Sequence, residues 1–197
     1  MTKIIGITGG IGSGKSTLSN HLKKLGFLVH ESDVVVNKMY NKPTKGFMQF
    51  LKKCGFEKAL KGKVIDKKLI THVVFNKKTV RKKLEKYIHK QVSLERERFI
   101  IKNLKTKKKA LFIDVPLLLE NKLEKNFNLV VCVISFKKNR VKRVLEKKIF
   151  SKLTLNKILK SQTNDKDRRK RSNIIINNNK SKKDFILVAE KALIDFL

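Results

Sequence analysis

A glycine-rich loop near the start of the chain is the feature that most constrains its fold. Residues 9–16 read Gly-Gly-Ile-Gly-Ser-Gly-Lys-Ser, which fits the pattern Gly-x4-Gly-Lys-Ser/Thr in full. The apolar run at residues 3–8 predicts a buried strand before the loop, and leucines at helical spacing predict a helix from Ser16 to Leu25 after it. Because glycines let backbone N–H groups approach phosphate oxygens at the start of a helix, the sequence predicts an ATP or GTP site here. The alternative is a glycine-rich turn with an incidental Lys-Ser pair.

Six consecutive residues provide the predicted contacts with the nucleotide: Gly12, Ser13, Gly14, Lys15, Ser16 and Thr17. The Lys15 ammonium is expected to reach the β- and γ-phosphates, and the Ser16 hydroxyl suits a magnesium ion. Thr17 is placed for a phosphate contact nearer the nucleoside. We call residues 9–16 the phosphate loop.

Further apolar runs alternate with helical patterns along the chain. The predicted strands after the first lie at residues 27–30, 110–116, 129–135 and 173–177. Residues 41–109 are lysine-rich and mainly helical, residues 185–196 predict a terminal amphipathic helix, and the polar stretch 161–172 gives only a hint of low complexity. This alternation predicts an α/β fold with a parallel five-stranded sheet covered on both faces.

Two carboxylates follow predicted strands, where open α/β sheets bind their ligands. Asp33 comes after the second strand, and Asp114 lies near the carboxyl end of the strand predicted at residues 110–116. Transfer of a phosphoryl group to a hydroxyl needs a carboxylate to accept the proton or to hold magnesium. The structural alternatives are a helix N-cap for Asp33 and a turn residue for Asp114, because Pro116 and leucines follow it in the sequence.

The charge of the chain suggests a polyanion as partner. There are 49 Lys and Arg residues against 16 Asp and Glu, a formal net charge of +33, yet only 8 of the basic residues are Arg. Arginine is preferred for bidentate recognition of phosphates and bases, so a lysine surface argues against a dedicated nucleic-acid site. Lysine, asparagine and isoleucine all have AT-rich codons, and drift of the genome is the favoured explanation of the excess. A nucleic-acid-binding protein stays open as an alternative.

The composition also bounds the compartment. No apolar run approaches the 18 residues of a membrane span, and the N-terminus reads as a strand and not as a signal peptide. Cys54 and Cys132 form no disulfide or zinc pattern. We therefore expect a soluble cytoplasmic protein without a membrane partner.

The chain resembles the dephospho-CoA kinases in these and further residues. Residues 7–17 are similar to that family's nucleotide loop almost letter for letter, and Asp33 matches the second Asp of its Asp-x-Asp. His89 matches the His of a His-Pro pair, and residues 114–120, Asp-Val-Pro-Leu-Leu-Leu-Glu, resemble its Pro-Leu-Leu-Phe-Glu signature. Gln162, Arg169 and residues 174–177 match its C-terminal pattern, so the resemblance covers essentially the whole chain.

The resemblance implies a fold like that of nucleoside monophosphate kinases, built as one domain from three parts. The P-loop core is expected at residues 1–36, 110–135 and 158–197. A helical substrate subdomain is expected at about 37–109 and a small lid at about 136–157. It implies ATP and Mg²⁺ as cofactors and transfer of the γ-phosphate to the ribose 3′-hydroxyl of dephospho-CoA, the last step of coenzyme A synthesis. It implies a monomer or weak homo-oligomer without a specific nucleic-acid partner.

The resemblance also assigns roles to single residues. Asp33 becomes the base that accepts the hydroxyl proton, Arg143 the lid arginine that stabilises the transferring phosphoryl group, and Arg169 a contact of ATP. The residues expected to bind the acceptor are Asp33, His89, Asp114 and Leu117. From sequence alone, a lone His such as His89 is more often structural than catalytic.

The chain departs from the family pattern in several places. Glu31 replaces the first Asp of Asp-x-Asp, Lys90 replaces the Pro after His89, and Lys147 stands where a second lid arginine is usual. Another small-molecule P-loop kinase, acting on a nucleotide or a sugar, remains the alternative among enzymes. The segment Pro116–Glu120 and the long helical middle favour dephospho-CoA.

Overall fold

The computed structural model describes residues 2–62, 64–106, 108–148 and 150–196. The chain divides into two compact units. The first unit contains the residues up to Glu31 together with those from Ile100 onward, and the second is the continuous segment Ser32–Phe99. Helix α5 begins in the second unit and ends in the first.

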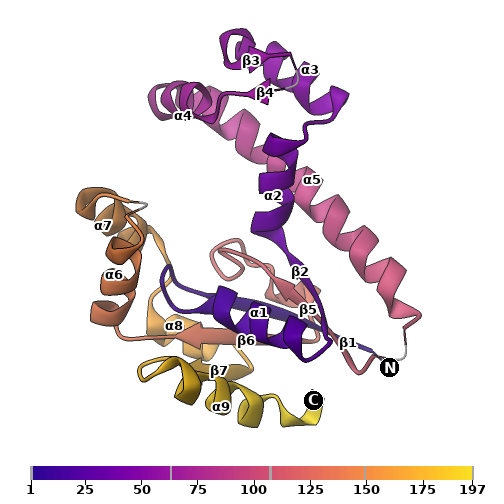
Figure 1. Ribbon diagram of the computed structural model, residues 1–197, viewed down its shortest axis with the longest axis vertical. Coiled ribbons are helices and arrows are strands. Elements are labelled where there is room, and N and C mark those ends of the chain that lie inside the picture. The colour runs from indigo at the N-terminus through magenta and orange to yellow at the C-terminus, as the bar shows by residue number, and fades with distance from the viewer. Residues whose placement is uncertain (1, 63, 107, 149, 197) are drawn as a thin grey trace. The chain divides into compact units, whose positions relative to one another are not determined.

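The first unit is an α/β layer structure (Figure 1). Its strands are β1 (Lys3–Gly9), β2 (Leu28–Glu31), β5 (Ala110–Asp114), β6 (Leu129–Ile134) and β7 (Ile174–Asn177). Its helices are α1 (Lys15–Lys24), α6 (Lys137–Glu146), α7 (Lys152–Ser161), α8 (Asp165–Lys170) and α9 (Lys182–Ala192), with short 3-10 turns η2 (Glu124–Asn126) and η3 (Ile194–Phe196).

The sheet confirms the prediction of a five-stranded parallel architecture. Its strand order is β2-β5-β1-β6-β7, and every neighbouring pair is parallel. The carboxyl ends of the strands therefore meet at one edge, where Glu31 of β2 pairs in register with Asp114 of β5. β1 lies at the centre, so the phosphate loop that follows it leaves the middle of this edge.

The core of the first unit lies between the sheet and two helices. Strands buried on both faces are continuous apolar runs, because neither side of the sheet meets water. On one face, Leu18 and Leu22 of α1 and Phe185 and Ala189 of α9 pack against the strands as one buried cluster. Helix α9 runs beside β7 (Figure 1), which secures the edge of the sheet.

The second unit is helical with one small hairpin. It contains α2 (Ser32–Asn41), α3 (Lys45–Lys53), η1 (Glu57–Ala59), β3 (Leu60–Lys61), β4 (Val64–Ile65), α4 (Lys67–Asn76) and most of α5 (Lys78–Leu104). Phe47, Leu51 and Phe56 are fully buried in its own core. Tyr87 of α5 stacks on Phe47 and Phe50, with ring centroids 5.6 and 4.0 Å apart, and so joins α5 to α3.

The segment 41–109 is mainly helical, as predicted, but it also contains the short β3–β4 hairpin, and the polar stretch 161–172 contains α8, neither of which was predicted. The alternative role of Asp33 as a helix N-cap was wrong. Asp33 is the second residue of α2 rather than its N-cap.

Candidate active site

The phosphate loop has the backbone conformation that its glycines permit. Gly12 and Gly14 have φ values of 72° and 109°, which a side chain would strain. A Cβ atom on Gly12 would lie 2.6 Å from the carbonyl oxygen of Arg140, and one on Gly14 would overlap the amide of Asn178. Helix α1 begins directly after Gly14, so its N-terminus opens into the loop.

Groups from distant parts of the chain hold the loop in this shape. The Asn178 amide donates to the carbonyl of Ser13 at 2.7 Å, and the Ile11 N–H donates to Gln162 Oε1 at 3.0 Å. Arg143 Nη1 donates to the carbonyl of Gly12 at 3.3 Å. The loop is thus tied to α6, to the segment after α7 and to the end of β7.

Lys15 and Asp114 meet at the carboxyl edge of the sheet. Lys15 Nζ lies 3.4 Å from Asp114 Oδ1, and both side chains are largely buried. The hydroxyl of Ser19, one turn along α1, donates to Asp114 Oδ2 at 3.0 Å. Asp114 is therefore engaged with the lysine that the motif assigns to the phosphates.

Two further arginines lie buried beside the loop. Arg140 and Arg168 are 9% and 2% exposed, and a Cβ atom on Gly10 would overlap the Arg140 guanidinium. Arg168 forms ion pairs with Asp165 at 2.9 Å and Glu120 at 3.4 Å. Burial lowers the pKa of the Arg140 guanidinium, although the nearby Asp165 opposes this. Its usual pKa lies so high that Arg140 remains a cation at neutral pH.

The arginines named from the resemblance differ in their surroundings. Arg143 donates to Ser135 Oγ at 3.2 Å and to two acceptors of Asn178, besides Gly12. Its guanidinium therefore holds the loop, and its role in phosphoryl transfer stays a prediction. Arg169 is exposed on α8, while its neighbour Arg168 faces the loop. The predicted contact between Arg169 and ATP also stays a prediction.

The remaining site residues lie in both units. Ser16 is exposed at the start of α1, and Thr17 is half-buried. Leu117 is 43% exposed and has a φ of 56°. Branched side chains rarely adopt this conformation, so the loop after β5 has an unusual backbone at this residue. Asp33 and His89 belong to the second unit, Asp33 two residues after the end of β2 and His89 exposed on α5.

Sequence reasoning missed Asn178 and gave Arg140 no specific role. The scarcity of arginine in a lysine-rich chain was a usable signal for Arg140. Asn178 stands among consecutive asparagines, so its type carried no signal. Its contact with Ser13 depends on the register of β7 beside β6.

The residues at the loop fit a magnesium–phosphate group. Among the described residues, the buried atoms Ser13 Oγ and Asp114 Oδ1 have no hydrogen-bond partner. The described part of the chain contains no cluster of three or more His, Cys, Asp or Glu side chains suited to a metal. Magnesium typically takes one or two carboxylates together with substrate phosphates, so the oxygen atoms of Asp114 and Ser16 are suitable protein ligands.

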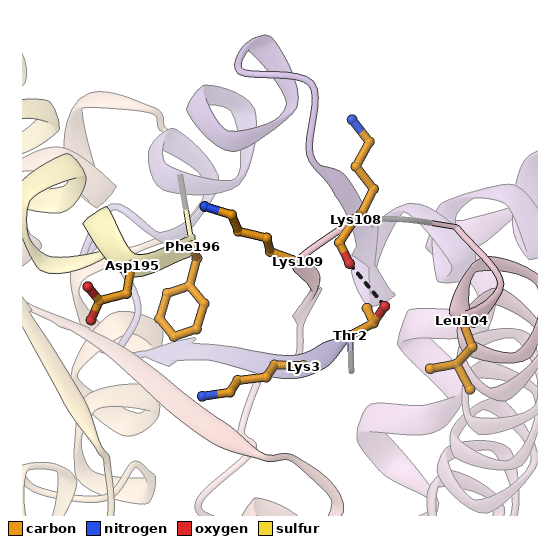
Figure 2. A pocket seen from close by; sticks show the side chains of 7 residues that line it. All are labelled: Thr2, Lys3, Leu104, Lys108, Lys109, Asp195 and Phe196. Carbon is orange, nitrogen blue, oxygen red and sulfur yellow. Dashed lines mark hydrogen bonds between the residues drawn. The ribbon is translucent and has the colours of Figure 1, made fainter.

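A separate cavity of about 610 Å³ lies at the opposite end of β1 from the phosphate loop. Figure 2 shows Lys3, Lys109 and Phe196 around it, and the hydroxyl of Thr2 donating to the carbonyl of Lys108. None of the motif residues lines this cavity.

Within the described residues, no helix combines the length and the apolar character needed to cross a bilayer.

Comparison with known proteins agrees with these observations. Residues 3–184 match the family model described as dephospho-CoA kinase. A dephospho-CoA kinase of Fusobacterium nucleatum is 33% identical over 190 residues, which is 95% of each chain. A crystal structure from Thermus thermophilus superposes with a TM-score of 0.78 at 27% identity, over 100% of this chain and 98% of the other. For the dephospho-CoA kinase of Campylobacter jejuni the TM-score is 0.71 at 26% identity, over 99% and 97%. The chain therefore belongs to the dephospho-CoA kinase family and is a kinase with the P-loop fold.

Proposed function

We propose that this kinase transfers the γ-phosphate of ATP to the ribose 3′-hydroxyl of dephospho-CoA, giving coenzyme A and ADP. The observation that carries the proposal is the family match over residues 3–184, together with a phosphate loop whose lysine meets a strand-end carboxylate. Family membership supplies the acceptor, and the loop supplies the donor site.

The nucleotide side of the reaction rests on residues of the first unit. Backbone N–H groups of Gly12, Ser13 and Gly14 would bind the phosphates at the N-terminus of α1, and Lys15 would neutralise charge that develops during transfer. Thr17 would contact the nucleotide nearer the nucleoside.

Magnesium would neutralise phosphate charge when bound. Ser16, which follows Lys15 at the start of α1, and Asp114, whose Oδ1 lies 3.4 Å from Lys15 Nζ, would hold it. Removal of Mg²⁺ with a chelator is expected to abolish turnover while some nucleotide binding persists.

The acceptor side of the reaction rests on the resemblance. Asp33 would accept the proton of the 3′-hydroxyl as it attacks the γ-phosphorus, and His89 and Leu117 would contact dephospho-CoA. Arg143 would stabilise the transferring phosphoryl group after releasing some of its present acceptors, and Arg169 would contact ATP. We further propose a cytoplasmic enzyme that is a monomer or a weak homo-oligomer.

The first experiment measures ADP production from ATP with and without dephospho-CoA. Acceptor-dependent ADP and the appearance of coenzyme A are expected. A shikimate, gluconate and nucleoside monophosphate panel tests the alternative of another small-molecule kinase. Turnover with one of these acceptors and none with dephospho-CoA would overturn the proposal.

Two variants then test the assigned roles. Asp33→Asn is expected to lower kcat by about 10²–10⁴ while ATP still binds, because the amide cannot accept the proton. Lys15→Ala is expected to lower turnover strongly through lost phosphate contacts. Wild-type kcat in Asp33→Asn would exclude Asp33 as the base, and wild-type kcat in Lys15→Ala would exclude the nucleotide site.

A further inference from the structure

One face of α1 contacts the ends of two neighbouring strands. Lys15, Ser19 and Lys23 are four residues apart, so they form a stripe along the helix. Lys15 and Ser19 contact Asp114 at the end of β5, and Lys23 forms an ion pair with Glu31 at the end of β2. Since Glu31 and Asp114 are partners in the sheet register, a single helix face secures both carboxylates.

The two oxygens of Asp114 have different surroundings. Oδ2 accepts the hydrogen bond from Ser19 at 3.0 Å, and Oδ1 faces Lys15 Nζ at 3.4 Å. Within the described residues Oδ1 accepts no hydrogen bond, although it is buried. Ser19 is 0% exposed and Asp114 7%, so water has little access to replace the Ser19 hydroxyl. The hydrogen bond therefore fixes the rotation of the carboxylate and directs Oδ1 to the phosphate loop.

We propose that Ser19 is a positioning residue for the phosphoryl-transfer site, holding Asp114 so that Oδ1 faces Lys15 and the bound magnesium–phosphate group. The proposal rests on the proposed function of that site. Groups that orient a metal ligand typically change metal affinity by about 10–100-fold when they are removed. Ser19 lies outside the eight-residue motif, which is why the motif alone does not identify it.

A purely structural role for Ser19 makes a different prediction. A buried hydroxyl needs an acceptor wherever it lies, and its loss would then lower stability without altering metal dependence. The two roles separate when nucleotide binding is measured as a function of Mg²⁺, with no acceptor present.

The test compares wild type, Ser19→Ala and Ser19→Cys by calorimetric titration of ADP at a series of Mg²⁺ concentrations. For Ser19→Ala, we expect the Mg²⁺ concentration at half-saturation to rise about tenfold. The affinity for ADP without Mg²⁺ should change less than about twofold, since the loop backbone is untouched. Cysteine is nearly isosteric with serine and is a weaker donor, so the Mg²⁺ half-saturation of Ser19→Cys should lie between those of wild type and Ser19→Ala.

Two controls accompany the titration. Lys23→Ala removes a contact of the same helix face that does not involve Asp114, and it should leave the Mg²⁺ dependence unchanged. In an Asp114→Ala background, Ser19→Ala should add no further shift, because the carboxylate that accepts the hydrogen bond of Ser19 is gone. Melting temperatures confirm that each variant is folded.

Several results would overturn the proposal: an unchanged Mg²⁺ half-saturation in Ser19→Ala, an equal loss with and without Mg²⁺, or the same shift in Lys23→Ala. These readouts use no acceptor. If the wild type binds ADP with Mg²⁺ and yet fails to phosphorylate dephospho-CoA, the proposed function fails while the role of Ser19 is still decided.

Discussion

At the scale of single residues, Asn178 shows how one amide joins separate elements. Its Nδ2 donates to the carbonyl of Ser13, while its Oδ1 and carbonyl accept from Arg143. Asn178 is buried, so losing either half of this arrangement would leave polar groups without partners. The shape of the phosphate loop therefore depends on a side chain far outside the motif.

Cys132 permits a prediction at this scale. Burial in β6 raises the pKa of its thiol to about 11, with Arg168 acting in the opposite direction. At pH 8 only about one thiol in a thousand is therefore ionised, and the thiolate is the reactive form. In the folded protein, an alkylating reagent is expected to modify Cys54, which is half-buried, long before Cys132.

Mass spectrometry of partially alkylated protein measures the two rates. Unfolding in urea should remove the difference between the cysteines. Rapid alkylation of Cys132 in the native state at pH 8 would contradict the burial of β6.

The site could be predicted in part. The motif around Lys15 and the strand-end position of Asp114 were recognised in the sequence, but the contact between the two side chains was not predicted. The partners of Arg143 and the contact between Gln162 and Ile11 could not be predicted, since they depend on how α6 and the segment after α7 fold back onto the loop. Side-chain hydrogen bonds across more than a hundred residues leave no periodic signal.

At the scale of elements, α1 depends on its apolar side. Leu18 and Leu22 are 0% and 1% exposed, and they lie in one cluster with Phe185 of α9. Leu22→Ala leaves a cavity that rigid strands cannot fill, and we expect the free energy of unfolding to fall by about 2–5 kcal/mol. Urea denaturation followed by circular dichroism gives the change.

Leu187→Ala is the matched control for Leu22→Ala. Leu187 lies on α9 and is 55% exposed, so its truncation should change stability by less than about 0.5 kcal/mol. Equal losses in the two variants would contradict the assignment of the α1–α9 face as the core.

The elements that were predicted and those that were missed differ in their apolar pattern. Strands β1, β5 and β6 are continuous apolar runs, which the sequence displays directly. Strands β3 and β4 have two residues each, too few to establish an alternating pattern. Helix α8 has six residues, is capped by Asn164 and buries Arg168 instead of an apolar side chain, so hydrophobic periodicity does not detect it.

At the scale of the whole molecule, the net charge of +33 calls for its own test. We expect binding to single-stranded DNA to be weak and nonspecific, with a Kd of about 10⁻⁴–10⁻⁶ M at physiological salt, and to weaken steeply as salt rises. Fluorescence anisotropy with oligonucleotides of several sequences, at 50 and at about 200 mM salt, measures this.

ATP should not compete strongly for that binding, because the lysine surface is diffuse. Sequence-selective binding with a Kd well below a micromolar at physiological salt would contradict this interpretation. Such binding would indicate a nucleic-acid-binding role in addition to the kinase activity.

The position of Asn178 also bears on the order in which the ribosome makes the chain. The amide that holds the carbonyl of Ser13 lies 165 residues further along the chain and is synthesised long after the phosphate loop. Strand β1 likewise waits for β5 and β6 before it has neighbours. A nascent chain therefore carries an apolar strand with unpaired edges until β5 and β6 have been made, a state that chaperones typically protect. The phosphate loop therefore acquires this contact only after Asn178 has been synthesised.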